Sequence, residues 1–380
     1  MRYKLKDIFD LQMGKTPSRN NSEYWNTEDY KWISIADLGK TGKYISETKE
    51  YLSESAVTDS GIKVIPANTV VMSFKLSIGK TAITAEDMYS NEAIMAFHDR
   101  HVVDILPEYI YYMFKYKNWD EGSNKAVMGK TLNKATLSEV EIDICSMEEQ
   151  REIVNVLDKM MAVLEGRKAE LALLDDLIKA RFVEMFESIH ESKKYPYIVV
   201  KDLTDVISGG TPSRKKAEYW DNGTIPWVKT TELQNNVIID VDEYITEAGL
   251  TDSSAKLVPA GTVLIAMYGQ GKTRGMTAYL GIDASTNQAC ACILPSNKID
   301  SVFLWKYFEL SYDKLRRLAQ GAGQPNLNGN MIKNFPVLVP PIDMQKDYVN
   351  FVNQIDKSKF ISINIIPEGG FYNGDKFYIS

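Results

Sequence analysis

Hydrophobic residues recur at alternating spacings of four and three along the middle of the chain, between Ser146 and about His190. The series consists of Ile153, Leu157, Met160, Leu164, Leu171, Leu174, Ile178 and Met185. This heptad spacing is interrupted only by Arg167 and Arg181, and it predicts a helix of roughly 65 Å at about 1.5 Å per residue. Ser146 followed by Glu149 is a capping-box pattern, which predicts where the helix begins.

A helix with one hydrophobic stripe needs a surface to cover that stripe. Two arrangements satisfy this need: an amphipathic helix lying on a globular core, or a coiled-coil spacer that pairs with a second helix between two domains. We favour the spacer, because the chain on either side of the helix repeats.

Residues 1–145 have the pattern of a mixed domain. Short β-like runs at Lys31–Ile35, Thr69–Phe74 and Ala93–Phe97 are separated by turns rich in Gly, Pro, Asn and Ser, and a helical segment spans about Pro107 to Lys117.

The second half of the chain repeats the first. Thr16-Pro17-Ser18-Arg19 returns 195 residues later (16 to 211) as Thr211-Pro212-Ser213-Arg214. Further matches are Tyr24-Trp25 with Tyr219-Trp220, Trp32 with Trp227, Val64–Ala67 with Leu257–Ala260, Ser90–Ala93 with Thr286–Ala289, Leu132-Asn133 with Leu327-Asn328, and Met147–Gln150 with Ile342–Gln345. Two copies are too few for a solenoid, so we expect two similar modules, each followed by a helix.

The second helix is expected to be shorter than the first. Its pattern runs from Ile342 to about Phe360, roughly 28 Å at about 1.5 Å per residue, and the heptad then stops. Two interpretations of the last twenty residues stay open: a truncated or replaced end, and a natural C-terminal strand that pairs with a neighbouring domain. The expected fold is α+β: two similar mixed α/β domains separated by a long coiled-coil helix, with a shorter second helix near the C-terminus. The expected boundaries are 1–145, 146–192, 193–340, 341–360 and an atypical tail, 361–380.

Composition is that of an ordinary globular protein, with 44% hydrophobic and 25% charged residues. No run of eighteen apolar residues and no secretory signal is present, so we expect neither a membrane span nor export. Cys145, Cys290 and Cys292 do not suit a disulfide framework or a four-ligand zinc site. These features favour a cytoplasmic location.

The net charge of −7 argues against a protein coated in positive charge, but basic residues gather locally. Acidic residues concentrate in the central helix, and positive loops on such a body remain compatible with docking on phosphates. The basic groups are Arg214, Lys215 and Lys216; Lys272 and Arg274; Lys314, Arg316 and Arg317; and Lys125, Lys130 and Lys134.

Catalytic and cofactor motifs are missing from the sequence. Gly271-Lys272-Thr273 follows an apolar run, but a phosphate-binding loop needs glycine at position 266, which is Ala. Gly79-Lys80-Thr81 occupies the corresponding place in the first copy, with Phe74 in place of that glycine, so we interpret the triplet as a feature of the repeat. His98 and His101 form the one close histidine pair and lack a matching ligand motif. We therefore expect no catalytic residue, no metal site and no cofactor in this chain.

These motifs together resemble a target recognition domain. They are Gly-Thr-Pro-Ser, Tyr-Trp, the Ile-Pro-Trp-Val strand, the Pro-Ala/Gly turn, Gly-Lys-Thr and Asn-Gln/Glu-Ala. Their repetition on both sides of a heptad helix is similar to the specificity subunit of a type I restriction–modification enzyme. The likeness covers about residues 1–360, and the tail from Ile361 departs from the family, in which the second helix continues.

The resemblance implies a division of labour. The specificity subunit would be non-catalytic, and each domain would read one half of a bipartite site on double-stranded DNA. The helices would set the spacing and dock two methyltransferase subunits, with restriction and translocase subunits attached indirectly. S-adenosylmethionine, ATP and magnesium are expected only in those partner subunits. The alternative is a truncated structural or regulatory relative that binds DNA or one methyltransferase subunit without forming an active complex.

Candidate DNA-binding residues lie in the polar loops of each copy, because Gln, Asn and Arg can contact base edges and Lys can contact phosphates. The repeated Thr-Pro-Ser turns also have a structural interpretation, since two domains that read different half-sites must differ. Tyr24, Trp25, Trp32 and their counterparts Tyr219, Trp220 and Trp227 are expected in the core. The candidates are Lys15, Thr16, Ser18, Arg19, Lys75, Ser77, Lys80, Lys125, Lys130, Thr131, Asn133 and Lys134 in the first copy, and Thr211, Ser213, Arg214, Lys215, Lys216, Tyr268, Gln270, Lys272, Arg274, Gln324, Asn326 and Asn328 in the second.

Overall fold

The repeated sequence folds into two units with the same strand order. The structure, a computed structural model of the chain, describes residues 1–25, 27–75, 77–119, 132–269, 271–319, 326–364, 370–373 and 376–379. Residues 1–165 form unit 1 and residues 166–380 form unit 2, so the boundary falls within the long helix α6 (Met147–Phe186).

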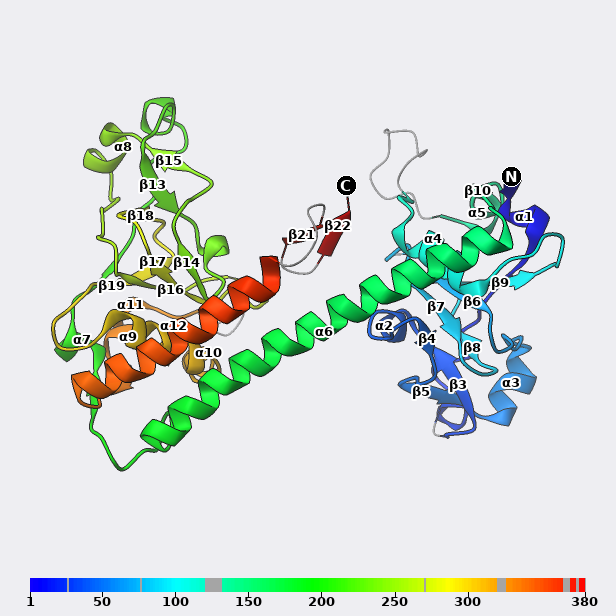
Figure 1. The fold of residues 1–380 in the computed structure, drawn as a ribbon, viewed down its shortest axis with the longest axis horizontal. Coiled ribbons are helices and arrows are strands. Elements are labelled where there is room, and N and C mark those ends of the chain that lie inside the picture. The colour runs from blue at the N-terminus through cyan, green and yellow to red at the C-terminus, as the bar shows by residue number, and fades with distance from the viewer. Residues whose placement is uncertain are drawn as a thin grey trace. The chain divides into compact units, whose positions relative to one another are not determined.

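Unit 1 is built on a five-stranded sheet with a smaller sheet beside it (Figure 1, blue to cyan). The five strands, in spatial order, are β2 (Phe9–Met13), β9 (Ile94–Asp99), β6 (Val70–Ser73), β7 (Thr81–Thr84) and β4 (Tyr44–Ile45). The smaller sheet has the order β5 (Glu50–Leu52), β3 (Tyr30–Ile33) and β8 (Tyr89–Ser90), and β1 (Arg2–Lys4) pairs with β10 (Glu141–Asp143).

Unit 2 repeats this topology strand for strand (Figure 1, green to orange). Its five-stranded sheet has the order β12 (Val206–Ser208), β19 (Cys290–Ile293), β16 (Val263–Ala266), β17 (Thr277–Leu280) and β14 (Asn236–Ile238). The smaller sheet is β15 (Tyr244–Ile245), β13 (Ile225–Val228) and β18 (Ser285–Thr286), and β11 (Tyr197–Val199) pairs with β20 (Pro336–Leu338). The internal repeat predicted from the sequence is therefore present in the fold.

Short helices connect the strands of both units. Unit 1 contains α1 (Leu5–Ile8), the 3-10 helix Ser22–Tyr24, α2 (Ile35–Leu38), α3 (Glu54–Ser60), α4 (Pro107–Tyr116) and α5 (Lys134–Ser138). Unit 2 contains α7 (Val200–Leu203), the 3-10 helices Ala217–Tyr219 and Thr230–Glu232, α8 (Glu247–Thr251), α9 (Ser301–Leu310), α10 (Tyr312–Leu318), α11 (Gly329–Lys333) and α12 (Ile342–Asn364). The predicted strands near residues 31, 69 and 93 and the predicted helix from Pro107 are confirmed.

Each five-stranded sheet is buried on both faces, because successive side chains of a strand point to opposite sides. In β6, Val70 and Met72 pack with α4, whereas Val71 belongs to the cluster on the opposite face. In β19, Ala291 and Ile293 pack with α9, and Cys290 and Cys292 enter the opposite cluster. All three cysteines are free thiols, and the two in β19 are fully buried core residues.

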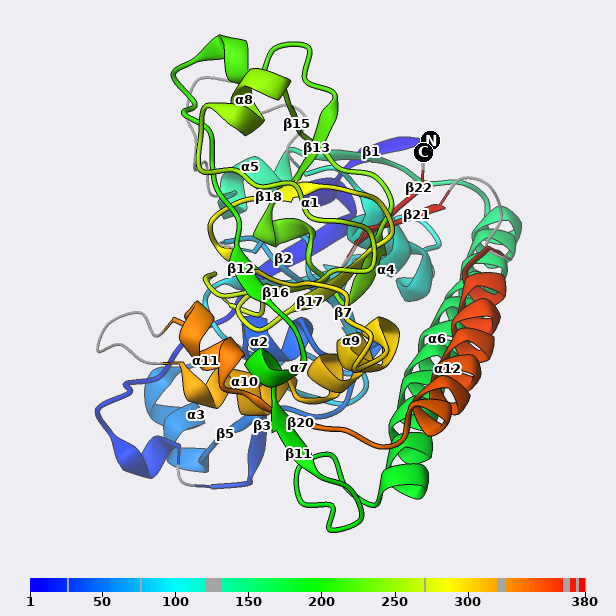
Figure 2. The same cartoon turned by 90° about the vertical axis from the view of Figure 1, so that its left-hand side faces the viewer.

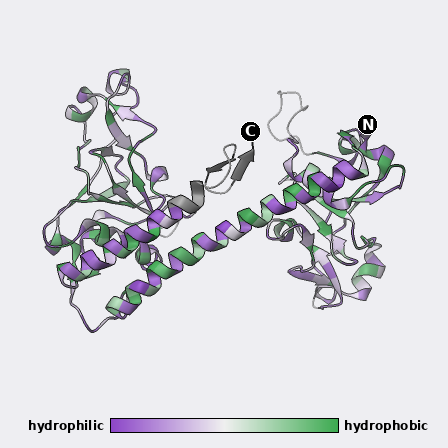
Figure 3. Cartoon of the chain, in the orientation of Figure 1, coloured by the Kyte–Doolittle hydropathy of each residue, from purple (hydrophilic) through white to green (hydrophobic). Residues whose placement is uncertain are grey.

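Helix α6 begins where its sequence predicts. The Ser146 side chain accepts a hydrogen bond from the Glu149 backbone amide at 3.3 Å, and the Glu149 carboxylate accepts one from the Ser146 amide at 2.9 Å. Hydrophobic and hydrophilic residues alternate along the whole helix (Figure 3). In unit 1, Val154, Leu157 and Met161 of α6 pack against the core that contains α4.

The stripe of α6 that packs inward differs in part from the predicted seam. Ile153 and Met160 are 40% and 42% exposed, whereas their neighbours Val154 and Met161 pack on the core. These two positions therefore do not pack on the core of unit 1, and their place in a coiled-coil seam stays a prediction. Of the other seam positions, Leu157, Leu164, Leu171, Leu174 and Met185 are half-buried, and Ile178 is buried.

Helix α12 packs antiparallel against the second half of α6 (Figures 1 and 2). Near the beginning of α12, Tyr348 is fully buried with Phe182 and Phe186 and lies with its hydroxyl 3.4 Å from the Ile178 carbonyl oxygen. Further along α12, the Lys359 ammonium binds the Asp175 carboxylate at 2.6 Å. The residue nearer the start of α12, Tyr348, thus contacts the later residue of α6, Ile178, and Lys359 contacts the earlier Asp175. The predicted shorter C-terminal helix packed on the long one is confirmed.

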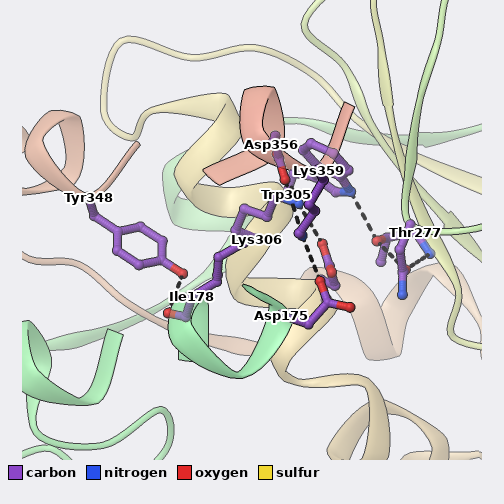
Figure 4. Close-up of polar contacts among 10 residues, drawn as sticks. Asp175, Ile178, Thr277, Trp305, Lys306, Tyr348, Asp356 and Lys359 are labelled. Carbon is purple, nitrogen blue, oxygen red and sulfur yellow. Dashed lines mark hydrogen bonds and ion pairs between the residues drawn. The ribbon is translucent and has the colours of Figure 1, made fainter. Parts of the chain in front are cut away.

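Charged side chains connect three helices at this junction (Figure 4). Lys306 of α9 lies 3.0 Å from Glu309 and 3.8 Å from Asp356 of α12, and Lys359 lies 3.2 Å from Asp356. With the bond from Lys359 to Asp175 of α6, opposite charges alternate from α9 through α12 to α6. Nearby, the Trp305 indole donates a hydrogen bond to the Thr277 hydroxyl at 3.1 Å.

Helix α12 ends at Asn364, slightly beyond the predicted end near Phe360. Two strands follow, β21 (Gly370–Asn373) and β22 (Lys376–Ile379), and they pair with each other as an antiparallel hairpin. The described part of the tail therefore forms strands, but these strands pair with each other and not with a neighbouring domain. The interpretation as a truncated or replaced end stays a prediction.

Candidate nucleic-acid interface

The Thr-Pro-Ser-Arg turn leaves the end of an edge strand in each unit, after β2 in unit 1 and after β12 in unit 2. Each turn begins at a glycine that touches another loop. A Cβ atom on Gly14 would lie 2.2 Å from the carbonyl oxygen of Asn91, and one on Gly209 would lie 2.3 Å from that of Thr286. Only glycine permits this approach, so both turns are fixed against the loop that follows β8 or β18.

The threonine of each turn binds the same loop. The Thr16 hydroxyl donates to the Glu92 carboxylate, and the Thr211 hydroxyl donates to the amide oxygen of Gln288. The bond from Thr16 is the main reason that the pKa of Glu92 is lowered, and the charges of Lys75 and Arg19 act in the same direction. In unit 1 the structure thus brings together candidates from the turn and from the loop after β6.

The arginine of each turn stacks on two tryptophans. The Arg19 guanidinium lies 3.8 Å from the centre of the Trp25 ring and 4.9 Å from that of Trp32, and it pairs with Glu50 at 2.5 Å. Both indoles in turn donate hydrogen bonds of 3.1 Å to the turn, from Trp25 to the Ser18 carbonyl and from Trp32 to the Lys15 carbonyl. These contacts give Arg19 a structural reason to be present.

Unit 2 repeats the stack in detail. Arg214 lies 3.6 Å from Trp220 and 4.9 Å from Trp227, and it pairs with Glu243 at 2.5 Å. The aromatic residues were expected in the core, and this is confirmed: Trp32 and Trp227 are 2% and 3% exposed, Tyr219 is buried, and Tyr24, Trp25 and Trp220 are half-buried around them. Ser18 and Ser213 are exposed and contribute their carbonyl oxygens to the tryptophans.

The loop after the central strand differs between the units. It has seven residues in unit 1 (74–80) and ten in unit 2 (267–276), between strands paired in the same register. The amide of Gly79 donates to the Ser73 carbonyl at 2.9 Å, and that of Gly275 donates to the Ala266 carbonyl at 2.9 Å. Both glycines have positive φ, 87° and 86°.

Gly79 therefore corresponds to Gly275 and not to Gly271. The expectation that Gly79-Lys80-Thr81 and Gly271-Lys272-Thr273 occupy equivalent places is wrong, because unit 2 carries three more residues in this loop. The second triplet lies inside the longer loop. The triplet was interpreted as a feature of the repeat because it was expected at the same place in both copies. Since the two triplets are not equivalent, this argument does not apply to Lys272.

The longer loop of unit 2 is held by α10. The Tyr312 hydroxyl donates to the Lys272 carbonyl at 2.7 Å, and the Arg316 guanidinium donates to the Arg274 carbonyl at 3.0 Å. These bonds use backbone oxygens, and they place Lys272 and Arg274 beside α10, which itself carries Arg316 and Arg317. Tyr268, at the start of the loop, is 41% exposed.

In unit 1 the shorter loop is fixed by its own residues. The Ser73 hydroxyl donates to the Ser77 carbonyl and accepts from the Lys80 amide at 3.1 Å. Ser77 is exposed, and Lys75 and Lys80 are half-buried. The two loops therefore present different side chains from the same place in the fold.

Asn133 and Asn328 have the same structural role in the two units. Asn133 accepts from the Thr136 amide at 2.9 Å at the start of α5, and Asn328 accepts from the Met331 amide at 2.9 Å at the start of α11. Both asparagines are N-caps, which accounts for their recurrence. Lys134 follows as the exposed first residue of α5. Candidates Lys125, Lys130, Thr131, Gln270 and Gln324 lie outside the described residues.

Three candidates near these loops have contrasting surroundings. Lys215 is exposed and makes no hydrogen bond or ion pair with the part of the chain that the structure describes. Lys216 donates to the Tyr219 hydroxyl at 2.7 Å, and this bond raises its pKa. The side-chain oxygen of Asn326 is buried and has no hydrogen-bond partner among the described residues, although Leu327, next to it, donates its amide to the Met267 carbonyl at 3.0 Å.

All of these segments meet at the same end of the strands in each five-stranded sheet, where β2 and β6, or β12 and β16, end and β9, or β19, begins. In unit 2, Ser208 and Ile265 both pair with Ala291, so β12 and β16 end where β19 begins. In unit 1, Met13 and Met72 both pair with Met95 in the same way. We call these strand ends the loop edge. Three segments lie there in each unit: the Thr-Pro-Ser-Arg turn, the loop 74–80 or 267–276, and the Asn-capped helix α5 or α11.

Sequence reasoning missed a group of lysines near the loop edge. Lys256 and Lys333 line a hollow of about 360 Å³ beside β12, together with Ser208, Gly329 and Asn330. The repeat could have identified Lys256, because a lysine directly precedes the repeated segment in both copies: Lys63 before Val64–Ala67 and Lys256 before Leu257–Ala260. Two buried residues of α6, Phe182 and Phe186, were also missed.

Two negative findings concern the described residues only. Within them, no group of three or more His, Cys, Asp and Glu side chains is arranged to hold a metal ion. Among the helices that the structure describes, none is both long enough and apolar enough to cross a membrane.

Comparisons with known proteins give the family. The family model of the type I restriction modification DNA specificity domain matches residues 1–173 and 192–368. The MjaIX type I restriction enzyme specificity subunit of Methanocaldococcus jannaschii is 24% identical over 376 residues, which cover 93% of this chain and 85% of that protein. The EcoR124I/EcoR124II specificity subunit of Escherichia coli is 26% identical over 217 residues, 56% of this chain and 52% of that protein.

A solved structure agrees in fold. The S subunit of a type I restriction–modification system from M. genitalium has a TM-score of 0.55 and 15% identity, and the match covers 96% of this chain and 91% of that one. Because both copies of the repeat match the family model over most of their length, the chain belongs to the family of type I restriction–modification specificity subunits.

Proposed function

We propose that the chain recognises a bipartite site on double-stranded DNA, with unit 1 reading one half and unit 2 the other. The observation that carries this proposal is the loop edge. In each unit a repeated scaffold of turn, strand ends and capped helix surrounds a loop that differs in length and side chains. A common scaffold with different loops is what two readers of different sequences require, since base edges are read by hydrogen bonds from specific side chains.

The loops after β6 and β16 are the proposed base readers. Lys75, Ser77 and Lys80 of unit 1 stand where unit 2 presents Tyr268, Lys272 and Arg274. Four other candidates make the same contacts in both units: Arg19 and Arg214 stack on tryptophans, and Asn133 and Asn328 cap helices. We propose that they support these loops. The remaining candidates, including those outside the described residues, stay predictions of DNA contact.

The helices are proposed to set the distance between the half-sites. Half-sites on one face of DNA lie about one helical turn apart, roughly 34 Å between centres. A continuous helix such as α6, with 40 residues, spans roughly 60 Å at about 1.5 Å per residue and is stiffer than a loop. The proposed functional division is 1–145 and 193–340 for recognition, 146–192 and 341–360 for spacing, and 361–380 for the tail.

As a specificity subunit the chain is not itself the catalyst, and catalysis in type I systems belongs to other subunits. We propose that α6 and α12 dock two methyltransferase subunits, which carry S-adenosylmethionine. Restriction and translocase subunits, with ATP and magnesium, would join indirectly.

A second candidate function follows from the unequal helices. Helix α12 has 23 residues against 40 in α6. If this difference removes one docking surface, the chain would bind DNA or one methyltransferase subunit without forming an active complex. Gel filtration of the chain with its methyltransferase separates the two candidates: a complex with two methyltransferase subunits supports the first, and a complex with one supports the second.

The proposed function is tested by co-expressing the chain with its methyltransferase and mapping methylated adenines across the host genome. A split motif with a spacer of fixed length is the expected result. A continuous motif, or no methylation from a complex that contains two methyltransferase subunits, would contradict recognition of a bipartite site.

A further inference from the structure

The hollow beside β12 is lined by two lysines and by no carboxylate. Its walls are Val206, Ile207 and Ser208 of the edge strand, Lys256, and Gly329, Asn330 and Lys333 of α11. Lys256 and Lys333 are both exposed, and neither makes a hydrogen bond or ion pair with a residue that the structure describes. Many lysines of this protein do make such pairs, for example Lys229 with Glu243 at 3.1 Å. Two unpaired ammonium groups around one hollow favour an anionic ligand.

The hollow adjoins the loop edge. Ser208 is the last residue of β12, directly before the turn that begins at Gly209, and a Cβ atom on Gly329 would lie 3.9 Å from the Ser208 hydroxyl. Asn328, which caps α11, directly precedes Gly329 of the hollow in the sequence. The amide of Leu327 donates to the carbonyl oxygen of Met267, the residue after β16. An anion in the hollow would therefore lie beside the loops proposed to read bases.

Unit 1 carries one lysine at the corresponding place and a second one in the corresponding helix. Lys63 corresponds to Lys256, 193 residues later. Lys134 is the first residue of α5, whereas Lys333 is the last residue of α11, the equivalent helix of unit 2. The Gln12 side chain of the edge strand β2 donates to the Lys63 carbonyl at 3.1 Å, which holds Lys63 beside the strand end. The side-chain ammonium groups of Lys63 and Lys134 are likewise exposed and unpaired within the described part of the chain. Each unit thus has two exposed lysines without a described partner, one directly before the repeated segment at residue 64 or 257 and one in the Asn-capped helix.

We propose that these two lysine pairs, Lys256 with Lys333 and Lys63 with Lys134, bind phosphates of the DNA backbone and position each unit for base reading. The inference rests on the proposed function and adds the residues that hold the backbone. Backbone contacts carry no sequence information, so both units can keep the same charge at this place, whereas base-reading loops must differ. The positive charge is local, since the whole chain has a net charge of −7.

The test is the salt dependence of duplex binding. The full chain and its Lys256→Gln/Lys333→Gln variant are titrated with a fluorescent random-sequence duplex at several salt concentrations. Each phosphate contact contributes about 0.9 to the slope of log K against log salt, so loss of two contacts lowers the slope by about 1.8 and weakens binding roughly 60-fold at about 0.1 M salt. The Lys63→Gln/Lys134→Gln variant is expected to lose the same amount of slope. The variant with all four substitutions is expected to lose about twice that amount from the slope of log K against log salt.

The matched control is Lys346→Gln/Lys357→Gln, which removes the same charge from two exposed lysines of α12. This control is expected to keep the wild-type slope within about 0.5. Equal slopes for the control and the hollow variants, in a wild-type chain that binds duplex DNA, would overturn this inference and leave the proposed function standing. A wild-type chain that binds no duplex at any salt concentration would overturn both. Unfolding curves of the variants should match the wild type, because none of the four lysines has a described partner.

Discussion

Replacing Lys306 by methionine tests whether the charged junction of α9, α12 and α6 holds unit 2 together. The Lys306 side chain is 5% exposed, and its ammonium group lies 3.0 Å from the Glu309 carboxylate. The same ammonium group lies 3.8 Å from the carboxylate of Asp356 (Figure 4). Methionine keeps most of the length of the side chain and removes only the charge. The change therefore leaves the half-buried Glu309 carboxylate, 27% exposed, without its nearest cation.

Removing one partner of a buried ion pair costs about 3–5 kcal/mol, because the remaining charge stays unpaired. For a unit of this size, about 1 kcal/mol lowers the melting temperature by roughly 2–4 °C, so the variant should unfold roughly 6–20 °C earlier. Burial already raises the pKa of Glu309, and Lys306 opposes that rise. Without Lys306 the pKa of Glu309 rises further. A carboxyl whose pKa is raised by folding destabilises the fold as the pH increases through that raised value, so the loss should be largest at neutral pH and shrink towards acid pH.

The assay is scanning calorimetry of the full chain at about pH 7 and about pH 5. Adding Glu309→Gln to Lys306→Met should recover most of the lost stability, because the unpaired charge is then removed. Lys346→Met, at an exposed position of α12, is the matched control and should leave the transition of unit 2 unchanged. A loss below about 1 kcal/mol for Lys306→Met, or no recovery in the double variant, would refute the reasoning.

The remaining predictions concern the stacked arginine and the buried thiols. Arg19→Ala should lower the stability of unit 1 by about 1–3 kcal/mol through loss of its two ring contacts and its pair with Glu50, and denaturant unfolding that matches the wild type would contradict this role. Cys290 and Cys292 should resist alkylation in the folded chain at neutral pH, because burial raises the pKa of both thiols; mass spectrometry that finds them modified as fast as in denatured protein would disprove it.

The sequence was sufficient for the features that depend on local patterns and on the repeat. The capping box at Ser146, the strands of unit 1 and the helix from Pro107 follow from residues close together in the chain. The repeat predicted two similar units, and the strand orders of the two sheets agree. The same repeat also identified Trp32 and Trp227 as core residues, since a scaffold shared by two readers is the part that does not vary.

Other features depend on contacts that the sequence does not show. A heptad pattern does not show which stripe of a helix packs on its own domain: Val154 and Met161 pack on the core of unit 1, whereas Ile153 and Met160 of the predicted seam are exposed. Three additional residues in the loop after β16 hid the correspondence of Gly79 with Gly275, which only strand register reveals. Nothing in the sequence around Lys306 distinguishes it from a surface lysine. Its side chain is buried because α12 covers α9.

The most direct test of the account is the exchange of one recognition unit. Residues 193–340 would be replaced by the equivalent segment of another family member, and methylated adenines would be mapped for both chains co-expressed with the same methyltransferase. The account predicts that one half of the split motif changes, while the other half and the length of the spacer stay the same. A change in both halves, or an unchanged motif, would contradict the claim that each unit reads its own half-site.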